Sequence, residues 1–128
     1  MRPHSTVALL ASVTVQLVGC SYGYRATATL DGHPDSLQGK AELPVAGGGR
    51  FHLSSPNNDL VCDGYAEPPE SPSSEQGCRG EHGSGSLRCS DGRTFLLSWK
   101  AITCRAFEGT GRDREGHTAR FSVTRQHP

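Results

Sequence analysis

In two stretches near the carboxyl end of the chain, every second residue is apolar and the residues between them are mostly polar. This alternation limits the fold more than any other feature. A period of two residues is that of a β-strand, whose side chains point in turn to the two faces of a sheet. No window of the sequence carries a helical stripe of apolar residues, so the sequence predicts an all-β fold. One face holds Phe95, Leu97 and Trp99 in the first stretch, opposite Leu96, Ser98 and Lys100, and Ala119, Phe121 and Val123 in the second, opposite Arg120, Ser122 and Thr124.

Turn residues divide the rest of the chain into further short strands. The sequence predicts strands over residues 24–30, 41–45, 50–54 and 60–62, with a polar connection over 33–40. Asp-Gly pairs follow three strands and predict hairpin turns of type I′, in which both central residues take positive φ. We expect one domain over residues 24–125, built as a small antiparallel sheet or a meander of hairpins, followed by a tail over 126–128. The pairs are Asp31-Gly32, Asp63-Gly64 and Asp91-Gly92.

One segment lacks a strand pattern. Residues 67–76 read E-P-P-E-S-P-S-S-E-Q, in which the prolines lack a backbone N–H donor and the serines and glutamates cannot build a core. The composition predicts a disordered, solvated surface loop. A recognition segment in polyproline II form is the alternative.

The carboxyl-terminal half nearly repeats itself. A unit that starts at Cys78 and another that starts at Cys104 both continue with Gly-x-Gly, a turn, and a phenylalanine, at Phe95 and Phe121 respectively. This pattern predicts an internal duplication of a β-hairpin.

The cysteines within the predicted domain indicate covalent bridges. Only 34% of the residues are hydrophobic, compared with roughly 45 to 50% in typical globular domains, so the core is expected to be thin. An even number of cysteines in a short exported chain predicts two disulfides, and the spacing alone allows three pairings. A metal site that recruits His82 or His117 is the alternative, although no C-x-x-C spacing supports it. The four cysteines are Cys62, Cys78, Cys89 and Cys104.

Residues 1–19 have the parts of an export signal. Arg2 gives a basic start, and the apolar run over residues 6–18 is about 13 residues long, shorter than the roughly 17 to 25 that span a bilayer as a helix. The next four residues, Leu17-Val18-Gly19-Cys20, resemble the bacterial lipobox at every position. The resemblance implies that residues 1–19 are removed, that the Cys20 thiol takes a diacylglyceryl group, and that its new amino terminus is acylated. A plain secretory signal and an uncleaved amino-terminal anchor are the alternatives.

A lipid-modified Cys20 would hold the protein on a membrane. Each buried methylene contributes about 0.8 kcal/mol, and two acyl chains already give stable anchoring. Residues 20–23 would then form the lipidated amino terminus and a short tether. Because Ser21 rather than aspartate follows the cysteine, the resemblance to Gram-negative lipoproteins implies the periplasmic face of the outer membrane rather than that of the inner membrane.

The strand and turn motifs resemble a group of small uncharacterised proteobacterial lipoproteins. That group carries a G-x-F-x-(V/L)-S segment, a C-x-G-x-Y motif or a close variant, a C-S-D-G-R turn and a final G-x-G segment with an aromatic strand. The matching residues here are 49–54, 62–65, 89–93 and 109–121, and the resemblance covers about residues 24–125. The Gly-x-Gly and Asp-Gly spacing is also similar to that of MORN-type β repeats.

The resemblance implies a disulfide pairing. The group commonly carries the two cysteines that match Cys62 and Cys89, which leaves Cys78 and Cys104 as a second pair. The group brings with it no catalytic, cofactor-binding or metal-binding residue.

The charge of the chain argues against nucleic acid as a partner. The formal net charge is zero, whereas general nucleic-acid binding requires an excess of basic residues. Acidic residues predominate over positions 20–77 and basic residues over 78–128. The simplest interpretation is a mixed, solvated surface within one fold, and a site for an anionic partner is the alternative.

The candidate catalytic residues do not form a recognisable site. His82 lies near Ser84 in a glycine-rich stretch predicted as a turn, and Asp91, Asp113 and Glu115 are expected to serve turns or to face water. We therefore predict a non-catalytic structural or interaction module without a cofactor, whose partner is an envelope protein or peptidoglycan.

Aromatic residues decide which surface to test first, because aromatic and arginine residues are enriched at binding hot spots. Tyr65, Trp99 and the arginine-rich hairpins are the first candidates. A carbohydrate-binding or peptidoglycan-binding module is the first alternative and requires an exposed aromatic residue, so burial of Trp99 would count against it. A small hydrolase is the second and requires a cleft that brings His82 or His117 to an acid.

Overall fold

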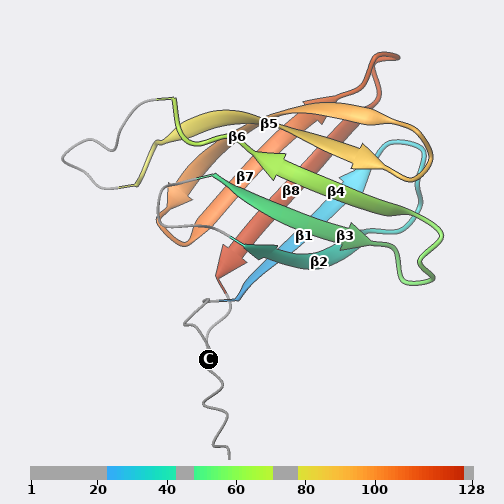
Figure 1. Cartoon of the computed structure of the whole chain (residues 1–128), viewed down its shortest axis with the longest axis horizontal. Coiled ribbons are helices and arrows are strands. Elements are labelled where there is room, and N and C mark those ends of the chain that lie inside the picture. The colour runs from blue at the N-terminus through green and yellow to red at the C-terminus, as the bar shows by residue number, and fades with distance from the viewer. Residues whose placement is uncertain (1–22, 43–47, 71–77, 126–128) are drawn as a thin grey trace, which may run out of the picture.

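The computed structural model describes residues 23–42, 48–70 and 78–125. Its eight antiparallel strands follow one another around a closed barrel, and β8 pairs with β1 to complete the circle (Figure 1). The predicted all-β antiparallel fold is therefore confirmed, with the meander closed on itself. The strands are β1 (Tyr24–Leu30), β2 (Leu37–Glu42), β3 (Gly49–Ser54), β4 (Val61–Ala66), β5 (His82–Cys89), β6 (Thr94–Thr103), β7 (Ala106–Arg112) and β8 (Thr118–Arg125).

Alternate residues of the strands point inward and form one core. The two alternating stretches of the sequence lie in β6 and β8, and the faces predicted to be apolar are the buried ones. Phe95 is fully buried, and Trp99 and Phe121 are exposed by only 6% and 7%. The period-two pattern thus identified both the strands and the direction of their side chains.

Three strands differ from the sequence-based prediction. The second strand begins at Leu37, within the stretch predicted as a polar connection, because Leu37 is fully buried and anchors it to the core. Residues 43–45 lie outside the described part of the chain. The fourth strand continues through Asp63-Gly64, which was predicted as a turn, and β5 contains the glycine-rich stretch around His82.

The glycines that misled the prediction provide space for aromatic rings. Gly64 lies directly opposite Phe51, and a Cβ at Gly64 would lie 2.1 Å from the ring. Gly83 lies opposite Trp99, where a Cβ would lie 2.7 Å from the indole. The same arrangement recurs in β7, where Gly109 faces Phe121. A glycine covered by a cross-strand ring is a known device for stabilising strongly curved sheets.

Glycine takes the left-handed position in the hairpin loops after β1, β5 and β7, and Asn58 takes it in the loop after β3. Gly92 and Gly116 have φ values of 90° and 86°, whereas Asn58 is the only described non-glycine residue with positive φ. The type I′ prediction is therefore wrong, because Asp91 does not take positive φ. The loop at Asp91-Gly92 is instead a three-residue hairpin with glycine in the left-handed position, closed by the Gly92 N–H to the Cys89 carbonyl at 3.0 Å.

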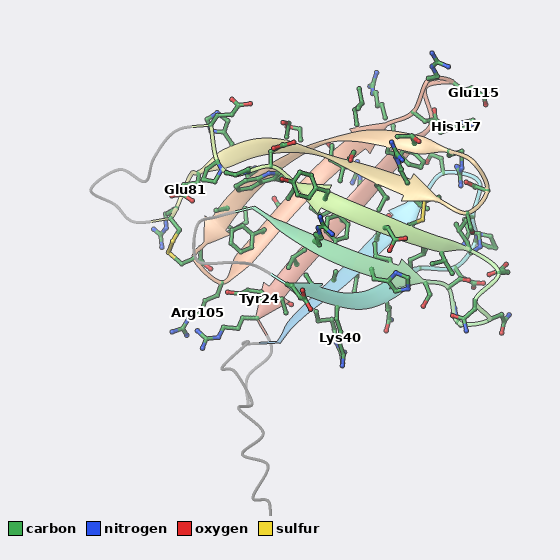
Figure 2. The ribbon with its side chains drawn as sticks, viewed as in Figure 1. Tyr24, Lys40, Glu81, Arg105, Glu115 and His117 are labelled. Carbon is green, nitrogen blue, oxygen red and sulfur yellow. A yellow bond between two sulfur atoms is a disulfide. The ribbon has the colours of Figure 1, made fainter. Side chains whose placement is uncertain are left out.

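The two ends of the barrel are built differently. We call the end that carries the hairpin loops 31–36, 55–60, 90–93 and 113–117 the loop end. The amino-terminal end holds Tyr24 and the end of β8, and Figure 2 shows Tyr24 far from Glu115 and His117 at the loop end. Of the segment predicted to be disordered, residues 67–70 lie beside β5, since Glu67 and Glu70 donate backbone hydrogen bonds to it at 2.8 and 3.0 Å. Residues 71–77 lie outside the described part.

Candidate interaction surface

The four cysteines of the domain form the two predicted disulfides. Cys62 and Cys89 are register partners on β4 and β5 and join these strands within the core. The bond between Cys78 and Cys104 joins the segment before β5 to the β6–β7 turn, and so links the starts of the two repeated units. These sulfurs are not available for the metal site considered as an alternative. Cys20 lies outside the described residues.

Each loop at the loop end contains an aspartate whose carboxylate accepts hydrogen bonds, either from residues of the same loop or from a neighbouring strand. The Asp31 carboxylate accepts hydrogen bonds from both the N–H and the hydroxyl of Thr118, at 2.8 Å each. Asp113 accepts hydrogen bonds from the backbone N–H groups of Glu115 and His117 at 2.9 and 2.8 Å. The Asp59 carboxylate accepts a hydrogen bond from the Ser55 hydroxyl. The Asp91 carboxylate accepts hydrogen bonds from the backbone N–H and the guanidinium of Arg93.

Contacts between the loops then close the loop end. The Arg93 guanidinium donates a hydrogen bond to the Asp31 carbonyl at 2.7 Å, although the two residues are far apart in the sequence. His33 lies 3.5 Å from Asp59 and connects the first two loops. The Asp31 carboxylate on Thr118, the Asp59 carboxylate beside His33 and the Arg93 guanidinium on the Asp31 carbonyl therefore join neighbouring segments at the loop end.

The hydrogen bonds lower the pKa values of these aspartates. The Thr118 N–H and hydroxyl hold the pKa of Asp31 below its usual value of 3.8, and the Ser55 hydroxyl does the same for Asp59. Desolvation raises the pKa of Asp91, but hydrogen bonds from Arg93 outweigh it and the net pKa is lowered. Desolvation likewise raises the pKa of Asp113, and its hydrogen bonds with His117 bring the net pKa below the usual value.

We expect acid to open the loop end. A carboxyl group whose pKa is lower in the folded state stabilises the fold above its unfolded pKa, and this stabilisation is lost as the pH falls through the folded pKa. The melting temperature should therefore drop as the pH falls below about 5 and through the lowered pKa values of these aspartates. The raised pKa of His33 does not affect this window, because its contribution is constant below the unfolded pKa of 6.5. Thermal unfolding at several pH values measures the drop, and the variant Asp31→Asn should show a smaller one. An equal drop in the variant would contradict the role of Asp31.

Within the part of the chain that the structure describes, the candidate histidines His82 and His117 contact acidic residues and no serine. His82 and Ser84 lie on the exposed outer face of β5, and the His82 ring is 3.5 Å from Glu70. His117 is 2.8 Å from Asp113, which also binds the backbone of its own loop.

A further grouping of serine, aspartate and histidine also lacks the order of a catalytic triad. Ser55 and His33 both contact Asp59, so the aspartate lies between them, whereas a triad places the histidine between the serine and the acid. A shallow polar depression nearby is not lined by His82 or His117, and it contains no ionisable side chain. Its lining residues are Ser36, Gln38, Ser54, Ser55, Pro56 and Asn58.

The predicted aromatic sites differ in their accessibility. Trp99 is buried, and its indole N–H donates a hydrogen bond to the Ser84 carbonyl at 3.2 Å. Tyr65, in contrast, is exposed by 41% on the outer face of β4. Of the two aromatic residues predicted to lie on a binding surface, Tyr65 is therefore accessible and Trp99 is not.

A continuous row of outward side chains crosses five strands and includes Tyr65. Each member of the row is the register partner of the next, from β3 to β7. Leu96, with 74% of its surface exposed, is the most exposed large apolar side chain of the described residues. The sequence placed Leu96 on the polar face, and an apolar residue between the inward Phe95 and Leu97 was the signal that could have identified this site. We call the row the outer stripe: Arg50, Tyr65, Ser86, Leu96 and Arg112.

No protein-family model, curated protein or solved structure matches the chain. Within the described residues, no helix is long and apolar enough to cross a membrane.

Proposed function

We propose that this chain is a bacterial envelope lipoprotein, anchored through Cys20, whose barrel is a non-catalytic interaction module. The use of the cysteines is the observation that carries the proposal. The chain has five cysteines, and four of them form disulfides within the barrel. The fifth is the cysteine that ends the lipobox-like Leu17-Val18-Gly19-Cys20. Disulfides persist in oxidising compartments, which agrees with export.

The position of the first strand supports the same proposal. β1 begins at Tyr24, so a cleaved chain would have only a few residues between the lipid and the barrel. Such a tether would keep the barrel close to the membrane surface, on the periplasmic face of the outer membrane if Ser21 directs transfer there. A partner within the envelope would then be reached by diffusion along that surface.

The alternative functions have less support from the residues. A carbohydrate-binding or peptidoglycan-binding module needs an exposed aromatic platform, and because Trp99 is buried, Tyr65 is the one exposed aromatic side chain among the described residues. A hydrolase needs a base and a nucleophile in a cleft, and His82 faces outward beside Glu70. The exposed Tyr65 and Leu96 favour protein recognition instead.

The anchor can be tested with one substitution and one matched control. In a Gram-negative host, Cys20→Ser should move the protein from the membrane to the soluble periplasmic fraction, because the thiol that carries the lipid is gone. Intact mass spectrometry of the unaltered protein should show a chain that starts at Cys20, carries three acyl chains and has lost four thiol hydrogens.

The control variant is Ser21→Asp. It keeps the modified cysteine, so it should remain lipidated and change only its distribution between the inner and outer membranes. A Cys20→Ser protein that still sediments with membranes, or an unaltered protein without added acyl mass, would refute the anchor.

A further inference from the structure

The outer stripe has the composition of a binding surface. Tyr65 and Leu96 lie on either side of Ser86, and an arginine follows at each end of the row. Adjacent strands are about 4.8 Å apart, so the stripe is roughly 19 Å long as measured along the barrel wall. Aromatic and arginine residues are enriched in protein interfaces relative to the rest of the surface.

The arginines of the stripe lack partners within the described residues. Neither Arg50 nor Arg112 forms an ion pair there, in contrast to Arg93, which is held by Asp91 at 2.7 Å. Arg88, next to the stripe on β5, lies opposite Asp63, but the Asp63 carboxylate contacts His52 at 2.6 Å. Arg50 and Arg112 therefore place positive charge at the two ends of the apolar centre, and the next register partner beyond Arg50 is the exposed Glu42 on β2.

The shape of this surface limits the kind of partner. The five strands that carry the stripe form part of a closed barrel, so the surface is convex, as the curvature of β4 and β5 shows in Figure 1. A convex surface with guanidinium groups around an apolar centre is complementary to a concave surface lined by carboxylates. Arginine binds carboxylates in a bidentate manner, which gives orientation as well as affinity.

We propose that the outer stripe binds an envelope protein with a concave acidic surface, with Tyr65 and Leu96 in the centre of the interface and Arg50 and Arg112 at its rim. The inference rests on the interaction role proposed above, but it does not depend on the lipid at Cys20. The opposite side of the barrel provides a matched reference, since β8 and β1 lie across it from β4 and β5. Thr29 and Arg120 are exposed register partners there.

Photo-crosslinking of the full chain in living cells tests the proposal. A benzophenone amino acid at position 98, one outward residue from Leu96, should give an adduct with an acidic envelope protein, whereas the same probe at position 29 should not. The double variant Arg50→Glu with Arg112→Glu should lower the adduct yield about tenfold, because it places like charges against the partner. The double variant Tyr65→Ala with Leu96→Ala should lower it to a similar degree. Arg120→Glu should leave the yield unchanged.

Several outcomes would overturn the proposal. One is an equal adduct yield at positions 98 and 29. Another is an adduct with a second copy of the chain, with lipid or with peptidoglycan. A third is an adduct yield that neither double variant lowers. Circular dichroism of the variants checks that the exposed substitutions leave the barrel folded. A parallel Cys20→Ser strain separates the two proposals, because loss of the anchor moves the protein between fractions, whereas loss of the stripe removes the adduct.

Discussion

Replacing Cys62 and Cys89 together by alanine is expected to lower the free energy of unfolding by more than about 3 kcal/mol. The bond closes a segment with a sequence separation of 27 residues, and loop-closure entropy alone assigns roughly 3 to 4 kcal/mol to a loop of that size. Cys62 is fully buried and Cys89 is exposed by 8%, so the substitution also removes packed sulfur atoms from the core. The loss is a large part of the roughly 5 to 15 kcal/mol that stabilises a typical domain.

The second disulfide provides the matched control. Cys78 and Cys104 close a segment of almost equal sequence separation, 26 residues, but lie outside the core. The double variant Cys78→Ala with Cys104→Ala should therefore lose the entropic part alone and be less destabilised. Urea unfolding curves of both variants give the comparison. Equal losses would show that burial of the Cys62–Cys89 bond adds nothing to its effect.

Gly64→Ala is expected to destabilise the barrel by about 3 kcal/mol, near the upper end of overpacking effects in protein cores. The new Cβ would lie 2.1 to 2.5 Å from three atoms of the Phe51 ring. This ring stacks on Phe121, with centroids 5.5 Å apart, so it cannot move away without disturbing a second core residue. Either the ring or the strand pairing must shift.

A double-mutant cycle tests this explanation. Phe51→Leu makes a smaller side chain at the point of contact, and we expect the variant with both substitutions to be more stable than the sum of the single losses predicts. Urea unfolding of the two single variants and the double variant supplies the cycle. Strictly additive losses would show that the Phe51 ring is not the cause of the destabilisation.

The sequence predicted the strands whose inward positions carry apolar side chains, and it missed or shortened those with glycine at an inward position. β6 and β8 have apolar side chains at the inward positions of their alternating stretches, most of them large. Their period of two is therefore visible within a single strand. β2 and β4 have Gly39 and Gly64 at inward positions. When only the sequence is known, a glycine indicates a turn. Whether it instead makes room for an aromatic ring depends on which residue of the neighbouring strand lies opposite it.

The candidate site depended even more on partners that are distant in the sequence. The contact between Asp31 and Thr118 joins residues 87 positions apart, which no local pattern contains. The disulfide pairing was implied by a family resemblance, since the spacing left three choices open. The outward direction of Leu96 was predictable from alternation, but its alignment with Tyr65 requires the register of β4, β5 and β6.

The pairing of β8 with β1 has a consequence for molecules that meet this protein. A sheet with a free margin can be extended by a foreign strand through main-chain hydrogen bonds, in a manner that largely ignores sequence. A circular sheet offers no such margin along β1 or β8. If the chain is anchored as proposed, copies crowded on a bilayer would be protected from adding to one another strand by strand. A partner that meets the barrel wall would then be recognised through side chains, whose identity evolution can change one residue at a time.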